Sequence, residues 1–221
     1  MTTASIDLAS LLCSRLCHDL LSPVGALSNG LELLAEEKDP EMRARCFELL
    51  EQSAKASADK LRFFRLAFGA AGGFGDTVPV AEPRALVDAL AGNNTRLQVN
   101  WVLGSDMLPK PAVKALLNLA LIGIEALVRG GTLDIAAETH EGQNGDQHGE
   151  TTEIVIRAAG PRIAFDPAIG HALEGTLQLE ALSSKTAPAT MIHQLATSLG
   201  GGLQVHLTDE ALLLGAILPT A

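Results

Sequence analysis

His18 is the residue in this sequence whose type and surroundings best suit a chemical reaction. An imidazole that is neutral near pH 7 is a competent nucleophile. Transfer of a phosphoryl group asks little of its acceptor beyond in-line positioning and charge stabilisation. Asp19 follows directly, and its carboxylate either polarises the imidazole or is simply solvated. We predict that His18 accepts a phosphoryl group and that Asp19 is its catalytic neighbour; the other interpretation of His18 is an idle surface histidine.

A smooth polar face surrounds this histidine if the segment is a helix. At about 100° per residue, Arg15 and Ser22 lie one turn to either side, and Gly25 and Asn29 continue the face. Small residues there would let a partner domain approach closely. Arg15 could steady phosphoryl oxygens as a charge-assisted donor, or form only an ion pair. The residues predicted to contact a partner are Arg15, Leu21, Ser22, Gly25 and Asn29.

The element that must position His18 is a long amphipathic helix, predicted from about Ser5 to Ala35. Its apolar stripe recurs every three or four residues and comprises Leu8, Leu12, Leu16, Leu20, Val24, Leu27, Leu31 and Leu34. His18 projects roughly opposite to the centre of this stripe, so we expect its imidazole to face water. Leu21 also points away from the stripe centre, and either extends the apolar core or contacts a partner.

A second helix is predicted to begin at Asp39-Pro40-Glu41, because an N-cap acid there precedes a proline at the first helical position. It runs to about Phe68, and the short connection makes the two helices an antiparallel hairpin. Its apolar side comprises Met42, Cys46, Leu50, Ala54, Leu61, Phe64 and Phe68. Two helices of about 30 residues cannot bury both stripes against each other, so we expect a second copy to complete a dimeric four-helix bundle.

Gly69 to Gly75 is the best linker candidate, and we place the boundary between two domains there, at 1–74 and 75–221. The second domain mixes helices and strands, which favours an α/β sandwich with helices on one face of a mixed sheet. The predicted fold class is therefore α+β. Helices are predicted at Pro83–Ala91, Pro111–Arg129 and Ala187–Leu199, and strands at Leu97–Leu103, Thr132–Glu138, Thr151–Ala158, Gly202–Leu207 and Ala211–Leu218.

The run His18-Asp19-Leu20-Leu21-Ser22-Pro23 resembles the H-box of sensor histidine kinases. In that family the histidine is phosphorylated, the acid after it assists, and the proline five residues on bends the helix. Pro23 fits this pattern, since an interior proline removes one backbone hydrogen bond and kinks a helix.

The second domain resembles the ATP-binding domain of the same kinases, but the positions that hold nucleotide differ. Asn118 resembles the start of the N-box, yet Ile122 stands where those kinases place the metal-binding Asn. Ala158 and Arg162 replace the Asp and the second Gly of Asp-x-Gly-x-Gly, and residues 186–189, Thr-Ala-Pro-Ala, replace Gly-x-Gly-Leu. We therefore expect no useful ATP binding.

A phosphorylatable histidine on a dimerising hairpin, followed by such a domain, resembles the ChpT-type histidine phosphotransferases of alphaproteobacterial cell-cycle relays. The resemblance covers nearly the whole chain. It implies that His18 takes a phosphoryl group from the aspartyl phosphate of a hybrid-kinase receiver and passes it to a response-regulator receiver, the CckA and CtrA types in this family. It also implies reversible transfer and a homodimer whose Mg²⁺ comes from the receiver. The alternatives are a divergent autophosphorylating histidine kinase and a non-catalytic adaptor that binds receivers.

Charge and composition exclude other classes. The 221 residues carry 16 Lys and Arg against 26 Asp and Glu, and no basic stripe is present that could neutralise nucleic-acid phosphates. Three cysteines, an odd number, and no signal-like start favour the cytoplasm.

The most apolar stretch, Leu116–Val128, is shorter than the roughly 20 residues of a membrane span. Cys13, Cys17 and Cys46 lack a fourth ligand at metal spacing, so we expect buried thiols and no metal or cofactor site.

Overall fold

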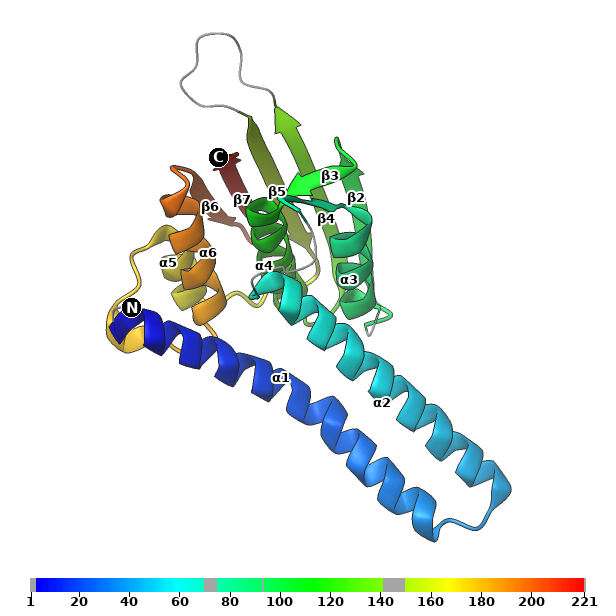
Figure 1. The fold of residues 1–221 in the computed structure, drawn as a ribbon. Helices are drawn as coiled ribbons and strands as arrows, with labels where there is room; N and C mark the ends of the chain where they lie inside the picture. Colours follow the sequence, from blue (N-terminus) through cyan, green and yellow to red (C-terminus); the bar gives the residue numbers. More distant parts are fainter. Residues whose placement is uncertain (1–2, 70–74, 93, 141–149, 221) are drawn as a thin grey trace.

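The computed structural model describes residues 3–69, 75–92, 94–140 and 150–220 of the chain (Figure 1). Its first part is the predicted antiparallel hairpin, formed by α1 (Thr3–Glu36) and α2 (Pro40–Ala67). Asp39 caps α2 as predicted, because its carboxylate accepts a hydrogen bond of 2.8 Å from the Glu41 N–H. Figure 1 shows the hairpin extending away from the sheet domain, with its turn at the far end.

Small side chains bring the two helices of the hairpin together. A Cβ on Gly30 would lie 2.9 Å from a methyl group of Leu50, so the glycine makes room for that leucine. Ser53 and Ser57 of α2 are buried, and the Ser57 hydroxyl donates to the Ser53 carbonyl. Arg43 closes the turn by donating to the carbonyl oxygens of Leu34 and Glu37.

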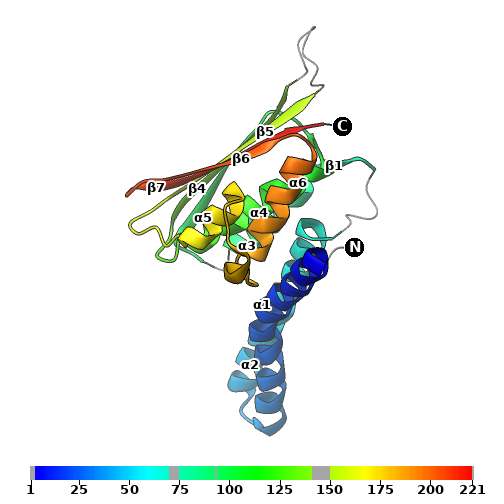
Figure 2. The same ribbon diagram turned by 90° about the vertical axis from the view of Figure 1, so that its left-hand side faces the viewer.

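The second part is a sandwich of a five-stranded mixed sheet with helices on one face, as predicted (Figure 2). The strand order is β2-β4-β5-β7-β6; β2 runs parallel to β4, and the other neighbours are antiparallel. The strands are β2 (Leu97–Leu103), β4 (Gly131–His140), β5 (Thr151–Ala159), β6 (Gly202–Leu207) and β7 (Ala211–Pro219), and the helices are α3 (Ala81–Ala91), α4 (Lys110–Ala126), α5 (Pro167–Glu174) and α6 (Ala187–Ser198).

Four short elements were not predicted from the sequence. They are β1 (Thr77–Pro79), β3 (Met107–Pro109), α5 and a 3-10 turn at Leu179–Ala181. A three-residue strand or a two-turn helix spans too few positions for its apolar period to be recognised. The predicted helix ending at Arg129 stops at Ala126 instead, because the chain turns through Gly130 and Gly131, both with positive φ.

The core is continuous between the two parts of the chain. Phe63, Phe64 and Leu66 at the end of α2 pack in the same apolar cluster as α4 and the helix-facing side of the sheet. The segment in which the domain boundary was predicted, 70–74, lies outside the described residues. The end of α2 therefore fixes the hairpin against the second domain.

Candidate functional site

His18 lies on the surface of α1, as its helical phase predicts. Its side chain is 81% exposed, and its Nδ1 atom is 3.1 Å from Oδ1 of Asp19. A carboxylate accepts hydrogen bonds, so this contact favours the neutral tautomer that carries its proton on Nδ1. The lone pair of Nε2 is then available to an electrophile approaching from solvent.

Asp19 is held by hydrogen bonds rather than freely solvated. Its side chain is only 17% exposed, and its Oδ2 accepts a hydrogen bond of 2.7 Å from Nε of Arg15. Its backbone oxygen accepts a hydrogen bond of 2.8 Å from Nζ of Lys60 on α2. Pro23 has no N–H to donate to that carbonyl four residues earlier, so Lys60 supplies the missing donor. Pro23 indicates from the sequence alone that one backbone carbonyl of α1 lacks its helical donor, but nothing in the sequence identified Lys60 as the replacement.

Arg15 forms the ion pair that was one of its two predicted alternatives. Its side chain is 11% exposed and lies between Asp19 and Glu125, a residue of α4 with which Nη2 pairs. Burial acts to lower the pKa of Arg15, but the carboxylates of Glu125 and Asp19 outweigh it and raise the pKa, so the guanidinium stays charged. Glu125 was missed because it is 110 positions away in the sequence.

The remaining residues of the predicted partner face are accessible. Ser22 and Asn29 are exposed, and a Cβ on Gly25 would meet no atom within 4 Å. Leu21 is 70% exposed, so within this chain it is not part of an apolar core. The exposed residues of this face are thus small or polar, apart from the large apolar side chain of Leu21.

The residues predicted to replace the nucleotide-binding residues of kinases, Ile122 and Ala158, and the N-box-like Asn118 are all buried. Ile122 and Ala158 are buried in the apolar cluster. Asn118 is also buried, and its amide nitrogen donates to the carbonyl oxygens of Ala67, 3.2 Å away, and Lys114, 2.8 Å away. Asn118 therefore ties α4 to the end of α2.

The residues that stand in place of the two glycine motifs form local contacts. Thr186 is buried, and its hydroxyl accepts a hydrogen bond of 2.9 Å from the Ser183 N–H at the start of α6. Gly160 packs against a neighbouring turn, since a Cβ there would lie 2.6 Å from the Gly130 carbonyl oxygen. Arg162 is exposed in the loop after β5.

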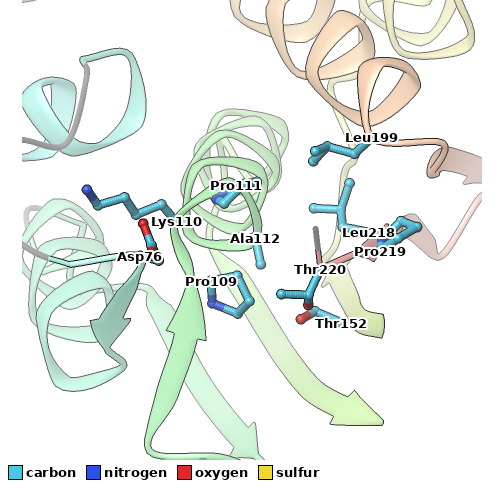
Figure 3. Close-up of a pocket in the computed structure, with 10 residues that line it drawn as sticks. All are labelled: Asp76, Pro109, Lys110, Pro111, Ala112, Thr152, Leu199, Leu218, Pro219 and Thr220. Atoms are coloured by element: carbon cyan, nitrogen blue, oxygen red, sulfur yellow. The ribbon is translucent and has the colours of Figure 1, made fainter. Parts of the chain in front are cut away.

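A cavity of about 480 Å³ lies between the N-terminal end of α4 and the end of β7 (Figure 3). Its lining is mainly proline, alanine and leucine, with Thr152, Thr220, Asp76 and Lys110 at its polar positions. Glu125 marks the opposite end of α4, so the cavity is remote from His18. The candidate reactive residue, His18, thus lies on the surface of α1 and not in this cavity.

Cys13 and Cys17 are exposed and Cys46 is partly buried, so the prediction of buried thiols is wrong for this chain. The side of α1 that carries Cys13 and Cys17 is left open by the hairpin. Across the ranges that the structure describes, no group of three or more His, Cys, Asp and Glu side chains could hold a metal ion. Among the same residues, no helix is long and apolar enough to cross a membrane.

Comparison with known proteins gives consistent matches. Residues 80–211 match the family model for the histidine phosphotransferase C-terminal domain. The protein phosphotransferase ChpT of Brucella abortus (strain 2308) is 33% identical over 216 residues, covering 98% of each chain. A solved structure of a bacterial phosphotransferase superposes with a TM-score of 0.79 at 32% identity and 98% coverage of both chains.

Proposed function

Because this chain belongs to the histidine phosphotransferase family, and is thus a phosphotransferase of a phosphorelay, we propose that His18 is its phosphoryl acceptor. The observation that carries the proposal is the exposed imidazole whose Nδ1 faces the anchored carboxylate of Asp19. That arrangement leaves Nε2 as the free nucleophile. Receiver domains, the partners of such phosphotransferases, could reach it over the polar face of α1.

In the proposed step, the Nε2 lone pair of His18 attacks the phosphorus of a receiver's aspartyl phosphate. An N–P bond forms while the P–O bond to the aspartate breaks, and the electrons of that bond remain on the aspartate carboxylate. The imidazole keeps its Nδ1 proton and gains positive charge, which the Asp19 carboxylate stabilises. No proton is lost, so the same step runs in reverse when a second receiver presents an unphosphorylated aspartate.

The donor we propose is the receiver of a CckA-type hybrid kinase, and the acceptor is a CtrA-type response regulator, in a cytoplasmic cell-cycle relay. The full-length similarity to ChpT supports this choice. We expect Mg²⁺ to arrive with the receiver, where it offsets charge on the phosphoryl oxygens. This chain then needs no cofactor of its own.

We further propose that the chain is not an ATP-dependent kinase. The burial of Ile122 and Ala158, and the use of Asn118 to hold α2, support this proposal. A nucleotide would need these positions to be polar and open.

A homodimer is the proposed assembly. The groove between α1 and α2, about 520 Å³ in volume, is lined largely by apolar residues such as Leu12, Leu16, Leu61 and Phe68. Val24 and Leu31, seven residues apart on α1, and Phe47 and Leu61 on α2 are about half exposed. Seven-residue spacing is typical of helices that pack in a bundle, so a second hairpin would cover this face.

The test is a transfer assay with a CckA-type receiver domain that carries a labelled aspartyl phosphate. The chain should take up base-stable, acid-labile label, and His18→Ala should take up none. His140→Ala is the matched control, because His140 Nε2 also lies about 4 Å from two carboxylates, those of Glu138 and Glu153. Uptake by His18→Ala equal to the wild type would refute the site.

Two arms of the same assay test the alternatives. Labelled ATP with Mg²⁺ and no receiver should leave the chain unlabelled, and labelling there would indicate a divergent kinase. Receiver binding without transfer in any arm would indicate an adaptor.

A further inference from the structure

A line of charged contacts connects the second domain to the imidazole of His18. Glu125 on α4 pairs with Nη2 of Arg15, Nε of Arg15 donates to Oδ2 of Asp19 at 2.7 Å, and Oδ1 of Asp19 lies 3.1 Å from Nδ1 of His18. We propose that Glu125 is a positioning residue for phosphotransfer, which acts through Arg15 to hold the Asp19 carboxylate against His18. This inference rests on the proposed function of His18.

The geometry of the guanidinium explains how Glu125 could act over this distance. The five N–H donors of an arginine form a rigid planar fork. Anchoring Nη2 on Glu125 therefore fixes the direction in which Nε points, and with it the orientation of the Asp19 carboxylate.

Helix stability does not account for the pair of Arg15 and Asp19 by itself. At i and i+4, the order with the acid first is the more favourable one in a helix, and here the base comes first. The side chains are also 11% and 17% exposed, so the pair is largely removed from water. A contact from outside α1 is a physical reason for this geometry, and Glu125 supplies it.

Charge balance leads to the same inference. Asp19 contacts two cations, Arg15 through its side chain and Lys60 through its backbone oxygen. Glu125 shares the charge of Arg15, so that Asp19 is not drawn wholly toward the guanidinium. One carboxylate oxygen then stays available to the Nδ1–H of His18.

The first measurement is the kinetics of transfer from the phosphorylated receiver, with Glu125→Gln. We expect kcat to fall about tenfold, a size usual for groups that orient a reactive residue indirectly, while KM for the receiver is unchanged. Asp134→Asn is the matched control, since Asp134 is similarly exposed and also pairs with an arginine, Arg157. A rise in KM at constant kcat would make Glu125 a receiver contact and overturn the inference.

The second measurement is the tautomer of His18, by ¹⁵N NMR of the full chain with labelled histidine, assigned with the His18→Ala variant. The wild type should show the proton on Nδ1, and Glu125→Gln should increase the fraction with the proton on Nε2. An unchanged tautomer and an unchanged kcat would both refute the positioning role.

A double variant shows whether the effect passes through Arg15. If it does, Arg15→Gln combined with Glu125→Gln should transfer no more slowly than Arg15→Gln alone. Additive losses would overturn the inference. Failure of the wild type to use His18 would refute the proposed function instead, so the two failures are distinguishable.

Discussion

The hairpin and the second domain both contain long helices with apolar side chains, but they bury those side chains to different extents. On α1 and α2, side chains such as Val24, Leu31 and Leu61 remain about half exposed. On α4, Leu116 and Leu117 are completely buried between the sheet and the neighbouring helices. One region leaves surface free for other molecules, whereas the other has closed around its own core.

The difference is consistent with the function proposed for each region. The proposed acceptor must be reached by a protein partner, and His18 on the hairpin is 81% exposed. If the sandwich holds no nucleotide, as we propose, the positions that resemble kinase nucleotide motifs are free to serve packing and contacts with α2, as Ile122, Ala158 and Asn118 do. Three substitutions test this contrast, and a fourth tests the electrostatics of a partly exposed helix cap in the second domain.

The largest effect should come from Ala158→Asp, which restores the acidic residue of the kinase motif. Ala158 is 0% exposed on the helix-facing side of β5, so the carboxylate would be buried without a partner. We expect a loss of about 3 kcal/mol or more in the free energy of unfolding, measured by urea denaturation. Ala159→Asp should cost much less, because neighbouring strand residues point to opposite faces. Equal stability of Ala158→Asp and the wild type, with ATP binding gained, would show that the nucleotide site is open.

The next effect concerns the open face of the hairpin. Leu61→Glu leaves the single chain nearly unaffected because Leu61 is half exposed, but it would place a charge in the proposed bundle. The dimer should weaken at least about 100-fold, and sedimentation at micromolar concentration should report the 23.1 kDa of one chain. Leu49→Glu, about 120° around α2, should remain dimeric. If both variants stay dimeric, a different surface forms the assembly.

A smaller effect is expected at the junction between the regions. Asn118→Ala removes two hydrogen bonds that a buried amide donates to backbone carbonyls, one of them at the end of α2. The free energy of unfolding should fall by about 1–3 kcal/mol. Asn100→Ala, which removes an exposed amide bonded to Asp134, is the control and should cost less. Similar losses would mean that Asn118 does not couple the two regions.

The smallest effect is a pH dependence on the surface of the second domain. The hydrogen bond from Lys185 and that from the Ala168 N–H lower the pKa of Asp166, which caps α5. Its folded pKa lies below its unfolded pKa, so its contribution to stability is present at neutral pH and lost as the pH falls through the lowered folded pKa. When the pH is lowered from 7 to about 3, the free energy of unfolding, measured by urea denaturation, should fall less in Asp166→Asn than in the wild type. Lys185→Gln should show the same trend, and an unchanged pH dependence in both would contradict the cause given.

Much of the fold followed from periodicity in the sequence. The hairpin, the Asp39 cap, three helices and five strands of the sandwich were predicted from apolar spacing and turn residues. The short elements β1, β3 and α5 were not, because so few residues give no period. The exposure of Cys13 and Cys17 was also mispredicted, since a helical stripe shows which side is apolar but not whether anything within the same chain covers it.

For the candidate site, the sequence by itself determined the residue and its direction. The helical repeat places His18 opposite the leucine stripe, and the adjacent Asp19 needs no folding to be near it. Tertiary structure alone decided what holds that carboxylate: Lys60 from α2 and, through Arg15, Glu125 from α4. The physical reason is that a periodic pattern fixes the face of one helix, whereas the partners of a side chain depend on which helix packs beside it.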